Sequence, residues 1–181
     1  MDSDNLIKGQ AVYLRQLSRG DASYDYLSWM SDADINCFLE SRFNPPKSIF
    51  EIEKYIDESA KNPDISLMGI FLNGEDRHIG NIKLGPINHH HKTADLGFLI
   101  GDKREWGKGL ASQAITLISN FGLTKLKLEK ITAGCYAENI GSQKSLLKAG
   151  FLHEGRLRSH WLCNGIRQDG LLFGKTAKAY E

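Results

Sequence analysis

The 181-residue sequence predicts a single α/β (α+β) domain in which helices flank a mixed central sheet. Apolar runs that end in Asn-Gly or Gly-Pro turns predict antiparallel hairpins in the middle of the chain. A later apolar run follows a helical pattern, which predicts a parallel strand reached through a crossover. No linker, repeat or low-complexity segment interrupts residues 1–181, so we expect one domain with a core at about residues 10–176.

The first third of the chain predicts one strand and two helices. Residues 12–17 are predicted as a strand, and the turn at residues 18–21 leads into the first helix. The Asn-Pro-Pro run at residues 44–46 breaks the chain, because a proline disfavours helix at the residue before it. Ser48, with Glu51 three residues later, predicts a capping box at the start of the second helix.

The rest of the chain predicts a series of strands and two capped helices. The predicted strands are residues 65–72, 79–84, 94–100, 130–136, 151–163 and 170–174. The helix between the third and fourth of these has a buried stripe of Leu110, Ala114, Leu117, Ile118 and Phe121. Asn139 is the predicted N-cap of a helix that ends at Lys148, with Gly150 as its C-terminal cap.

Composition excludes several functional classes. A formal net charge of +1 gives no general argument for a nucleic-acid or anionic-membrane partner. No apolar run approaches the ~20 residues that span a bilayer, and the polar residues 1–5 do not resemble a secretion signal. Three widely spaced cysteines predict reduced thiols in the cytoplasm.

The adjacent His89, His90 and His91 cannot all face one ion, so we expect an exposed hairpin end and no metal.

The most informative segment is the loop at residues 101–111, between an apolar strand and a helix. Gly107 and Gly109 let the backbone pass close to a ligand, and the following helix points its unpaired N–H groups at the same place. This arrangement predicts a phosphate-binding site. The loop also carries basic residues at Lys103, Arg104 and Lys108.

Two common nucleotide motifs do not fit this loop. A P-loop has four residues between its glycines and a hydroxyl after its lysine, whereas five residues separate Gly101 from Gly107 and Gly109 replaces the hydroxyl. The dinucleotide motif needs a third glycine where Ser112 lies. The phosphate therefore belongs to another kind of ligand.

The segment Arg104-x-x-Gly107-x-Gly109-x-Ala111 resembles the acetyl-CoA signature of the GCN5-related N-acetyltransferases (GNAT). Asn139-x-x-Ser142 and the run at residues 148–151 resemble the next block of that family. The C-terminal part of the chain, with Glu154-Gly155-Arg156, Asn164-Gly165 and Asp169-Gly170, is similar to the branch that contains ribosomal-protein, spermidine and sugar-nucleotide acetyltransferases. The resemblance covers nearly the whole chain in the right order.

The resemblance implies that two parallel strands, residues 94–100 and 130–136, splay apart and hold the pantetheine arm of acetyl-CoA between them. It also implies a bulge at Gly97 that aims a backbone N–H at the thioester carbonyl, and a glycine inside a strand is itself consistent with a bulge. The pyrophosphate is expected on the amides of residues 106–111. Asn139 and Ser142 contact the pantetheine or cap their own helix. The expected acetyl-CoA-binding residues are Phe98, Leu99, Ile100, Arg104, Glu105, Trp106, Gly107, Lys108, Gly109, Leu110, Ala111, Asn139, Ser142 and Lys148.

Acetyl transfer to an amine needs a proton acceptor, because an alkylammonium with a pKa of about 10 is protonated at pH 7. Asp95, on the first splayed strand, is the preferred candidate, and Glu40 is the second. The family's usual acid is a tyrosine, but Leu146 occupies that position here. The acid is therefore unassigned between Ser142, acting through water, and Tyr136.

The resemblance thus implies an acetyl-CoA-dependent N-acetyltransferase in which the amine attacks directly in a ternary complex. No cysteine lies in an obvious nucleophile setting, so we expect no acetyl-enzyme. Residues 37–43 and 78–87 look most like relatives that act on amino-sugar nucleotides, and a protein N-terminus is the main alternative acceptor. A non-catalytic acyl-CoA-binding module, supported by Leu146, stays open, as does assembly into a homodimer.

Overall fold

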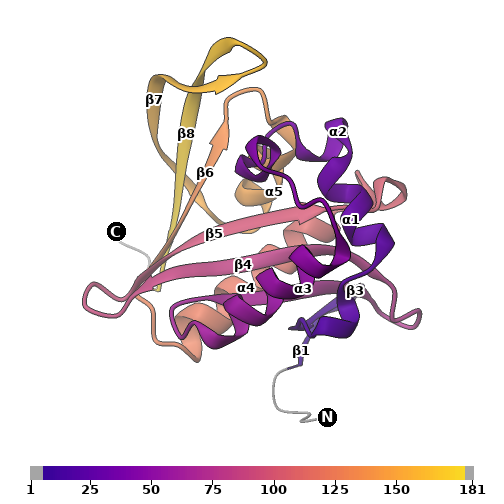
Figure 1. Ribbon diagram of the computed structural model, residues 1–181. Helices are drawn as coiled ribbons and strands as arrows, with labels where there is room; N and C mark the ends of the chain where they lie inside the picture. The colour runs from indigo at the N-terminus through magenta and orange to yellow at the C-terminus, as the bar shows by residue number, and fades with distance from the viewer. Residues whose placement is uncertain (1–5, 178–181) are drawn as a thin grey trace.

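A computed structural model describes residues 6–177 and shows one mixed eight-stranded sheet with the order β1-β2-β3-β4-β5-β6-β8-β7 (Figure 1). The strands are β1 (Ile7–Lys8), β2 (Val12–Gln16), β3 (Ser66–Leu72), β4 (His78–Asn88), β5 (Thr93–Ile100), β6 (Lys130–Tyr136), β7 (Leu152–Cys163) and β8 (Ile166–Thr176). The helices are α1 (Tyr24–Ser31), α2 (Ala33–Asn36), α3 (Ile49–Lys61), α4 (Leu110–Thr124) and α5 (Ile140–Lys148), with short 3-10 turns η2 (Arg19–Asp21), η3 (Glu40–Phe43) and η4 (Lys103–Glu105). The predicted fold class is confirmed. The polar segment at residues 1–5 lies outside the described residues.

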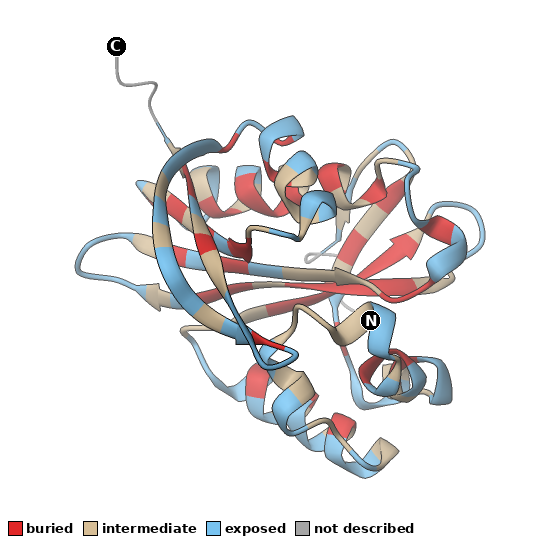
Figure 2. Cartoon of the chain, turned by 90° about the horizontal axis from the view of Figure 1, so that it is seen from above, coloured by how far each residue is buried: buried red, intermediate tan, exposed pale blue. Residues whose placement is uncertain are grey.

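Helices cover both faces of the sheet (Figures 1 and 2). One face packs on α4, in a core that includes Leu14, Ile82, Leu96, Ile118 and Ile131. The other face packs on α1 and α3, in a second core that includes Leu17, Trp29, Ile52 and Phe71. Figure 2 shows the buried residues concentrated on the strands and on the inner sides of the helices. No helix within residues 6–177 is long and apolar enough to cross a membrane.

The cap predictions are confirmed at two helices. The Ser48 hydroxyl accepts the Glu51 N–H at 3.3 Å at the start of α3. The reciprocal half of the predicted box is displaced by one residue, since the Glu51 carboxylate accepts from the N–H of Lys47. At α5, Asn139 caps the first turn, and Gly150 follows the last turn with a φ of +85°. Both helices therefore begin where their sequence signals indicate.

β5 and β6 form the only parallel pair in the sheet built by residues 6–177, and they separate after three residue pairs. The last pair joins Asp95 to Thr132, although β5 continues to Ile100 and β6 continues to Tyr136. Figure 1 shows the two strands diverging from that point. The predicted splayed pair is confirmed.

The bulge predicted at Gly97 is wrong. β4 and β5 stay in register around this residue, with Gly97 opposite Lys83. The register shifts instead between Leu84 and Ile87, where β4 contains one more residue than β5. Because Pro86 has no N–H to give to the ladder, a bulge is the place where a strand accommodates it. The strand predicted to end at residue 84 therefore continues past the proline.

Candidate functional site

Backbone groups without a strand partner line the gap between β5 and β6. The N–H of Gly101 donates to the Ile79 carbonyl of β4 at 2.8 Å. Successive residues of a strand direct their N–H and C=O groups to opposite edges. Leu99 therefore also faces β4, whereas Phe98 and Ile100 face β6, which has already diverged. The sheet therefore leaves the backbone N–H and C=O groups of Phe98 and Ile100 without a strand partner, on the side where an extended ligand would lie.

The loop before α4 presents a second set of unpaired amides. The first intrahelical bond of α4 runs from the Gln113 N–H to the Gly109 carbonyl, so the amides of residues 109–112 have no partner within the helix. Gly107 and Gly109 have φ angles of +76° and +78°, in the left-handed region that other residues resist. The helix dipole adds partial positive charge at this end. Such a helix terminus can bind a phosphate.

The charged side chains of the loop form a network with one another. Arg104 binds Asp102 through Nε and Nη2 at 2.9 and 2.8 Å, and Lys108 binds Glu105 at 3.0 Å. Both carboxylates are buried, and Arg77 bridges them from the end of the β3–β4 turn. The hydrogen bond from Arg104 lowers the pKa of Asp102, and that from Arg77 lowers the pKa of Glu105. These side chains, three of them expected among the ligand-binding residues, therefore hold the loop in shape.

Lys148 is placed differently from the loop cations. A Cβ built on Gly109 would lie 3.3 Å from the Lys148 Nζ, so this ammonium lies directly over the loop backbone. The Trp106 amide, which is expected to bind the pyrophosphate, donates to the Lys103 carbonyl at 3.2 Å. Its indole N–H donates to the Ile100 carbonyl at 2.8 Å, on the edge of the gap. The structure thus places the Lys148 ammonium beside the unpaired amides at the start of α4. The Trp106 amide is not one of these unpaired amides.

The first turn of α5 lies beyond this loop. The Asn139 side chain accepts the Ser142 N–H at 3.0 Å, so the capping role is the one that the structure shows. Leu146, where the family's tyrosine would lie, is 1% exposed within the main core and offers no hydroxyl. Near its start, α5 presents the half-buried hydroxyl of Ser142.

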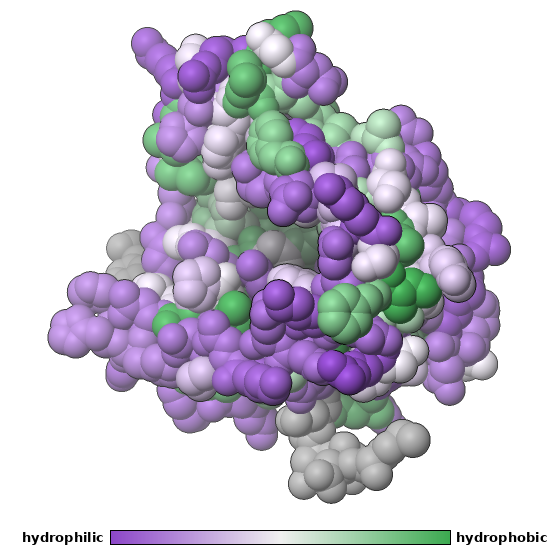
Figure 3. All heavy atoms as spheres, in the orientation of Figure 1, coloured by the Kyte–Doolittle hydropathy of each residue, from purple (hydrophilic) through white to green (hydrophobic). Residues whose placement is uncertain are grey.

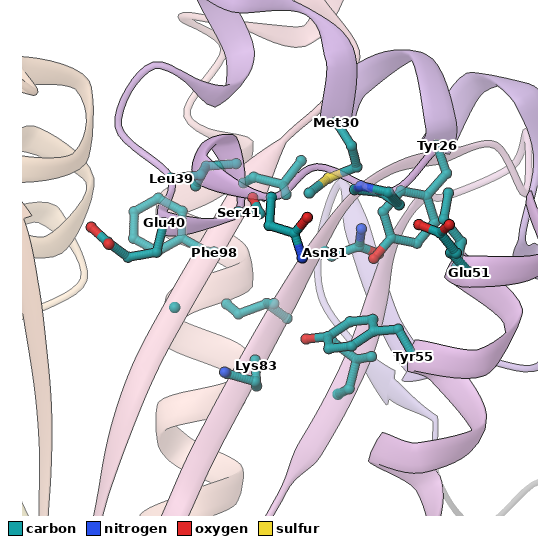
Figure 4. A pocket seen from close by; sticks show the side chains of 17 residues that line it. Tyr26, Met30, Leu39, Glu40, Ser41, Glu51, Tyr55, Asn81, Lys83 and Phe98 are labelled. Carbon is teal, nitrogen blue, oxygen red and sulfur yellow. The ribbon is translucent and has the colours of Figure 1, made fainter. Parts of the chain in front are cut away.

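A cavity of about 510 Å³ lies between the sheet and the segments α1, η3 and α3, on the face opposite α4 (Figure 4). Figure 3 shows the molecule hollowed between the β6–β8 side and the α1–α3 side. The cavity reaches residues 97–99 of β5, which lie beyond the last pair with β6. Its polar wall consists of Tyr26, Glu40, Ser41, Asn44, Glu51, Tyr55, Asn81 and Lys83. We call this cavity the amine pocket.

Glu40 connects the amine pocket to β6. Its carboxylate accepts the Tyr136 hydroxyl at 3.1 Å, and Arg42 donates to the same hydroxyl at 2.6 Å. Burial raises the pKa of Tyr136, and the opposing hydrogen bond from Arg42 does not cancel this effect. The phenol therefore keeps its proton at neutral pH. The rings of Phe38 and Trp161 pack on it at centroid distances of 5.5 and 4.9 Å.

Asp95 lies where β5 and β6 are last paired, at the closed end of the gap between them. Its carboxylate accepts a hydrogen bond from the Thr132 hydroxyl, in the last residue pair before the strands separate. The side chain is exposed and is not part of the pocket wall. The two predicted proton acceptors are thus in different places, with Glu40 in the pocket and Asp95 where the two strands separate.

The three histidines lie in the exposed turn between β4 and β5, as expected. His89 pairs with Asp64 at 2.9 Å, and the rings of His90 and His91 contact one another. Within residues 6–177, no group of three or more potential ligand residues is arranged to hold a metal ion.

Arg77 offers a direct test of the loop network. Arg77→Met removes the cation shared by two buried carboxylates and should loosen the loop on which the sequence predicts acetyl-CoA binding. We therefore expect the KM for acetyl-CoA to rise at least about 10-fold with kcat little changed. Arg19→Met is a matched control, since Arg19 pairs with Asp57 on the surface, and it should leave this KM unchanged. Steady-state kinetics at saturating amine measures both variants.

The pH dependence of the same variant follows from the lowered pKa values of Asp102 and Glu105. A carboxylate whose pKa is lowered by folding stabilises the fold above its ordinary pKa, and loses that effect as the pH falls through the lowered value. The difference in Tm between wild type and Arg77→Met should therefore shrink as the pH falls below about 4. A constant difference would contradict the network.

Comparison with known proteins agrees with this geometry. Residues 11–152 match the family model described as an acetyltransferase (GNAT) domain. The probable N-acetyltransferase YjcK of Bacillus subtilis (strain 168) is 30% identical over 172 residues, which covers 91% of this chain and 93% of that protein. The spermidine N(1)-acetyltransferase of Escherichia coli (strain K12) is 28% identical over 155 residues, or 86% and 80% of the two chains.

Solved structures show the same fold. A spermidine N-acetyltransferase from Vibrio cholerae, in complex with CoA and spermine, superposes with a TM-score of 0.82 at 24% identity, over 93% of this chain and 97% of that one. A putative ribosomal-protein-serine acetyltransferase from Vibrio cholerae gives a TM-score of 0.76 at 23% identity, over 97% and 99%.

The splayed strand pair and the glycine-rich helix start agree with this family match, which defines the protein as an acyltransferase that uses acetyl-CoA as co-substrate. The chain belongs to the GNAT acetyltransferase family, and it is an acetyl-CoA-dependent N-acetyltransferase of that type.

Sequence reasoning missed several residues of this site. Arg77 lies outside every motif, and Arg42 and Asn81 lie in residues 37–43 and 78–87, which indicate only a likeness to other acetyltransferases. Their roles depend on partners that the fold brings close, such as Glu105, which is 28 residues from Arg77, and Tyr136, which is 94 residues from Arg42. A buried amide on a predicted strand is the one signal that could have singled out Asn81.

Proposed function

We propose that the protein acetylates a primary amine in the amine pocket, by direct attack on acetyl-CoA lying between β5 and β6. The observation that supports this most is that pocket and gap meet at residues 97–99. An amine entering from the α1–α3 side can reach the thioester without a covalent intermediate. The cysteines agree with this, because burial raises the pKa of Cys37, raises that of Cys135 to about 11, and leaves Cys163 inaccessible.

In this proposal the pyrophosphate of acetyl-CoA lies at the start of α4, against the amides of residues 107–111 and the ammonium of Lys148. The pantetheine arm runs along β5, where Phe98 and Ile100 face it. The Phe98 N–H lies where the pocket meets the gap, and we propose it as the donor to the thioester carbonyl. One such donor contributes about 3 kcal/mol to stabilising the developing oxyanion.

Glu40 is the proposed proton acceptor. The substrate ammonium first gives a proton to the Glu40 carboxylate, which frees the lone pair of the nitrogen. The nitrogen then bonds to the acetyl carbon, the C–S bond breaks to release the thiolate of CoA, and the second proton that the nitrogen loses passes to that thiolate. Thiols have a pKa of about 8.5, so the thiolate leaves with little assistance. Ser142 and Tyr136 are the hydroxyls proposed to return a proton to it. Asp95 remains the alternative proton acceptor.

The acceptor is a primary amine, and three classes are candidates. The curated spermidine acetyltransferases suggest a polyamine. The amino-sugar nucleotide and the protein N-terminus are the two acceptors that the sequence resemblance favours.

A panel of amines tests this proposal by CoA thiol release. We expect at least one of spermidine, an amino-sugar nucleotide and an N-terminal peptide to raise thiol release at least about 100-fold over acetyl-CoA alone. The same compound with every primary amine acetylated is the matched control and should give no increase. If acetyl-CoA binds but no primary amine raises the rate, the binding-only alternative is correct and the proposal fails.

A further inference from the structure

We infer that Asn81 selects acceptors that carry an oxygen atom close to the amine, by donating a hydrogen bond to that oxygen. This inference rests on the proposed function, because it concerns the same pocket. It adds a chemical requirement that separates the candidate acceptors from one another.

The Asn81 side chain is buried without a partner for its amide nitrogen. Asn81 is 5% exposed on β4 and belongs to the wall of the amine pocket, where Figure 4 labels it beside Tyr26 and Met30. Its Nδ2 atom has no hydrogen-bond partner among the described residues. Buried polar groups in native proteins are nearly always paired, because an unpaired one loses its bonds to water without replacement. A bound acceptor molecule would supply the missing partner.

His78 fixes which end of the Asn81 amide is unpaired. The Nε2 of His78 lies 2.9 Å from both the Gly80 carbonyl and the Asn81 Oδ1. The carbonyl can only accept, so Nε2 carries the proton, and the amide group next to it must be the oxygen. Burial lowers the pKa of His78, so the ring is neutral and this N–H is its single donor. The NH₂ group of Asn81 is therefore the end without a partner.

The surroundings hold this arrangement rigidly. His78 packs against the rings of Trp29 and Phe71 at centroid distances of 5.1 and 4.8 Å. Because the imidazole cannot turn freely between these rings, the Asn81 amide has a fixed orientation. A fixed donor discriminates between ligands better than one that can turn to another partner.

The charges of the pocket favour the same kind of ligand. β4 supplies a second donor, Lys83, two residues beyond Asn81 on the pocket wall. Glu40 and Glu51 contribute carboxylates from η3 and α3. A ligand that satisfies both sets carries an amine and one or more oxygen atoms. A peptide N-terminus and an amino sugar share this chemistry, whereas a polyamine has only nitrogen atoms and leaves the Asn81 donor unpaired.

Matched amine pairs test the inference with the wild-type enzyme. L-Alaninamide is compared with sec-butylamine, and glucosamine with cyclohexylamine, with spermidine as a fifth substrate. We expect kcat/KM to favour the oxygen-bearing member by at least about 10-fold in one pair or both, and the pair with the larger ratio identifies the source as peptide-like or sugar-like. Equal values within both pairs, or spermidine as the best substrate, would overturn the inference while leaving the proposed function intact.

Asn81→Leu removes the donor at nearly constant volume. We expect it to abolish the preference within the discriminating pair while the KM for acetyl-CoA stays within about twofold. Asn88→Leu, at the exposed end of the same strand and outside the pocket wall, is the control and should keep the preference. A preference that survives in Asn81→Leu contradicts the inference. If that variant fails to fold, the wild-type pairs still decide, and if no amine is acetylated, the proposed function itself has failed.

Discussion

Gly107→Val should raise the KM for acetyl-CoA at least about 100-fold, because it moves the backbone that we place against the pyrophosphate. Gly107 has a φ of +76°, which costs a side-chain-bearing residue about 1–2 kcal/mol. No atom lies within 4 Å of the position that its Cβ would take, so the protein has room to fold around the substitution. Titration of acetyl-CoA against wild type and variant measures the loss.

Gly165→Val provides a closely matched control. Gly165, in the turn between β7 and β8, has the same φ of +76° and equally open space at its Cβ position. Both substitutions should lower the Tm by similar amounts, and only the one at Gly107 should weaken acetyl-CoA binding. If both variants bind acetyl-CoA like wild type, the loop is a structural turn and the phosphate site lies elsewhere.

Glu40→Gln should lower kcat at least about 100-fold without changing the KM for acetyl-CoA. The amide keeps the size of the carboxylate and can still accept the Tyr136 hydroxyl through its oxygen, but it cannot take a proton from the amine. The remaining activity should recover as the pH rises toward the amine pKa of about 10, since the free amine then needs no base. Rates over a pH series measure both effects.

Asp95→Asn is the comparison that decides between the two carboxylates. Because Asp95 is exposed, bound to Thr132 and absent from the pocket wall, we expect its substitution to lower kcat less than about 10-fold. A loss of 100-fold or more in Asp95→Asn, together with a small loss in Glu40→Gln, would return the role of base to Asp95. Equal, small losses in both would point to solvent as the proton acceptor.

The fold was largely predictable because its signals are local. Ser48 and Asn139 are next to the helices that they cap, and the Asn164-Gly165 turn lies between the strands that it joins. The splayed pair could be predicted only through the family resemblance, since nothing in residues 94–100 indicates where pairing with a distant strand ends. The bulge predicted at Gly97 is wrong for a similar reason. A glycine inside a strand is consistent with a bulge, but the bulge lies on the neighbouring strand β4, beside Pro86.

The candidate site was predictable where it consists of backbone and not where it consists of side-chain pairs. The glycines at 107 and 109 have the positive φ angles that their spacing indicated. The pairing of Arg104 and Lys108 with buried carboxylates was not foreseen, because a charge in a sequence does not reveal its partner. The contact between Glu40 and Tyr136 joins residues 96 positions apart. Only the folded chain brings them together.

Initial rates of thiol release over a grid of acetyl-CoA and amine concentrations test the central claim most directly. Direct attack in a ternary complex predicts reciprocal plots that intersect, with free CoA competing against acetyl-CoA, for whichever amine the panel identifies. Parallel plots, together with acetylated enzyme isolated in the absence of amine, would show that the acetyl group passes through a covalent intermediate and would contradict the account.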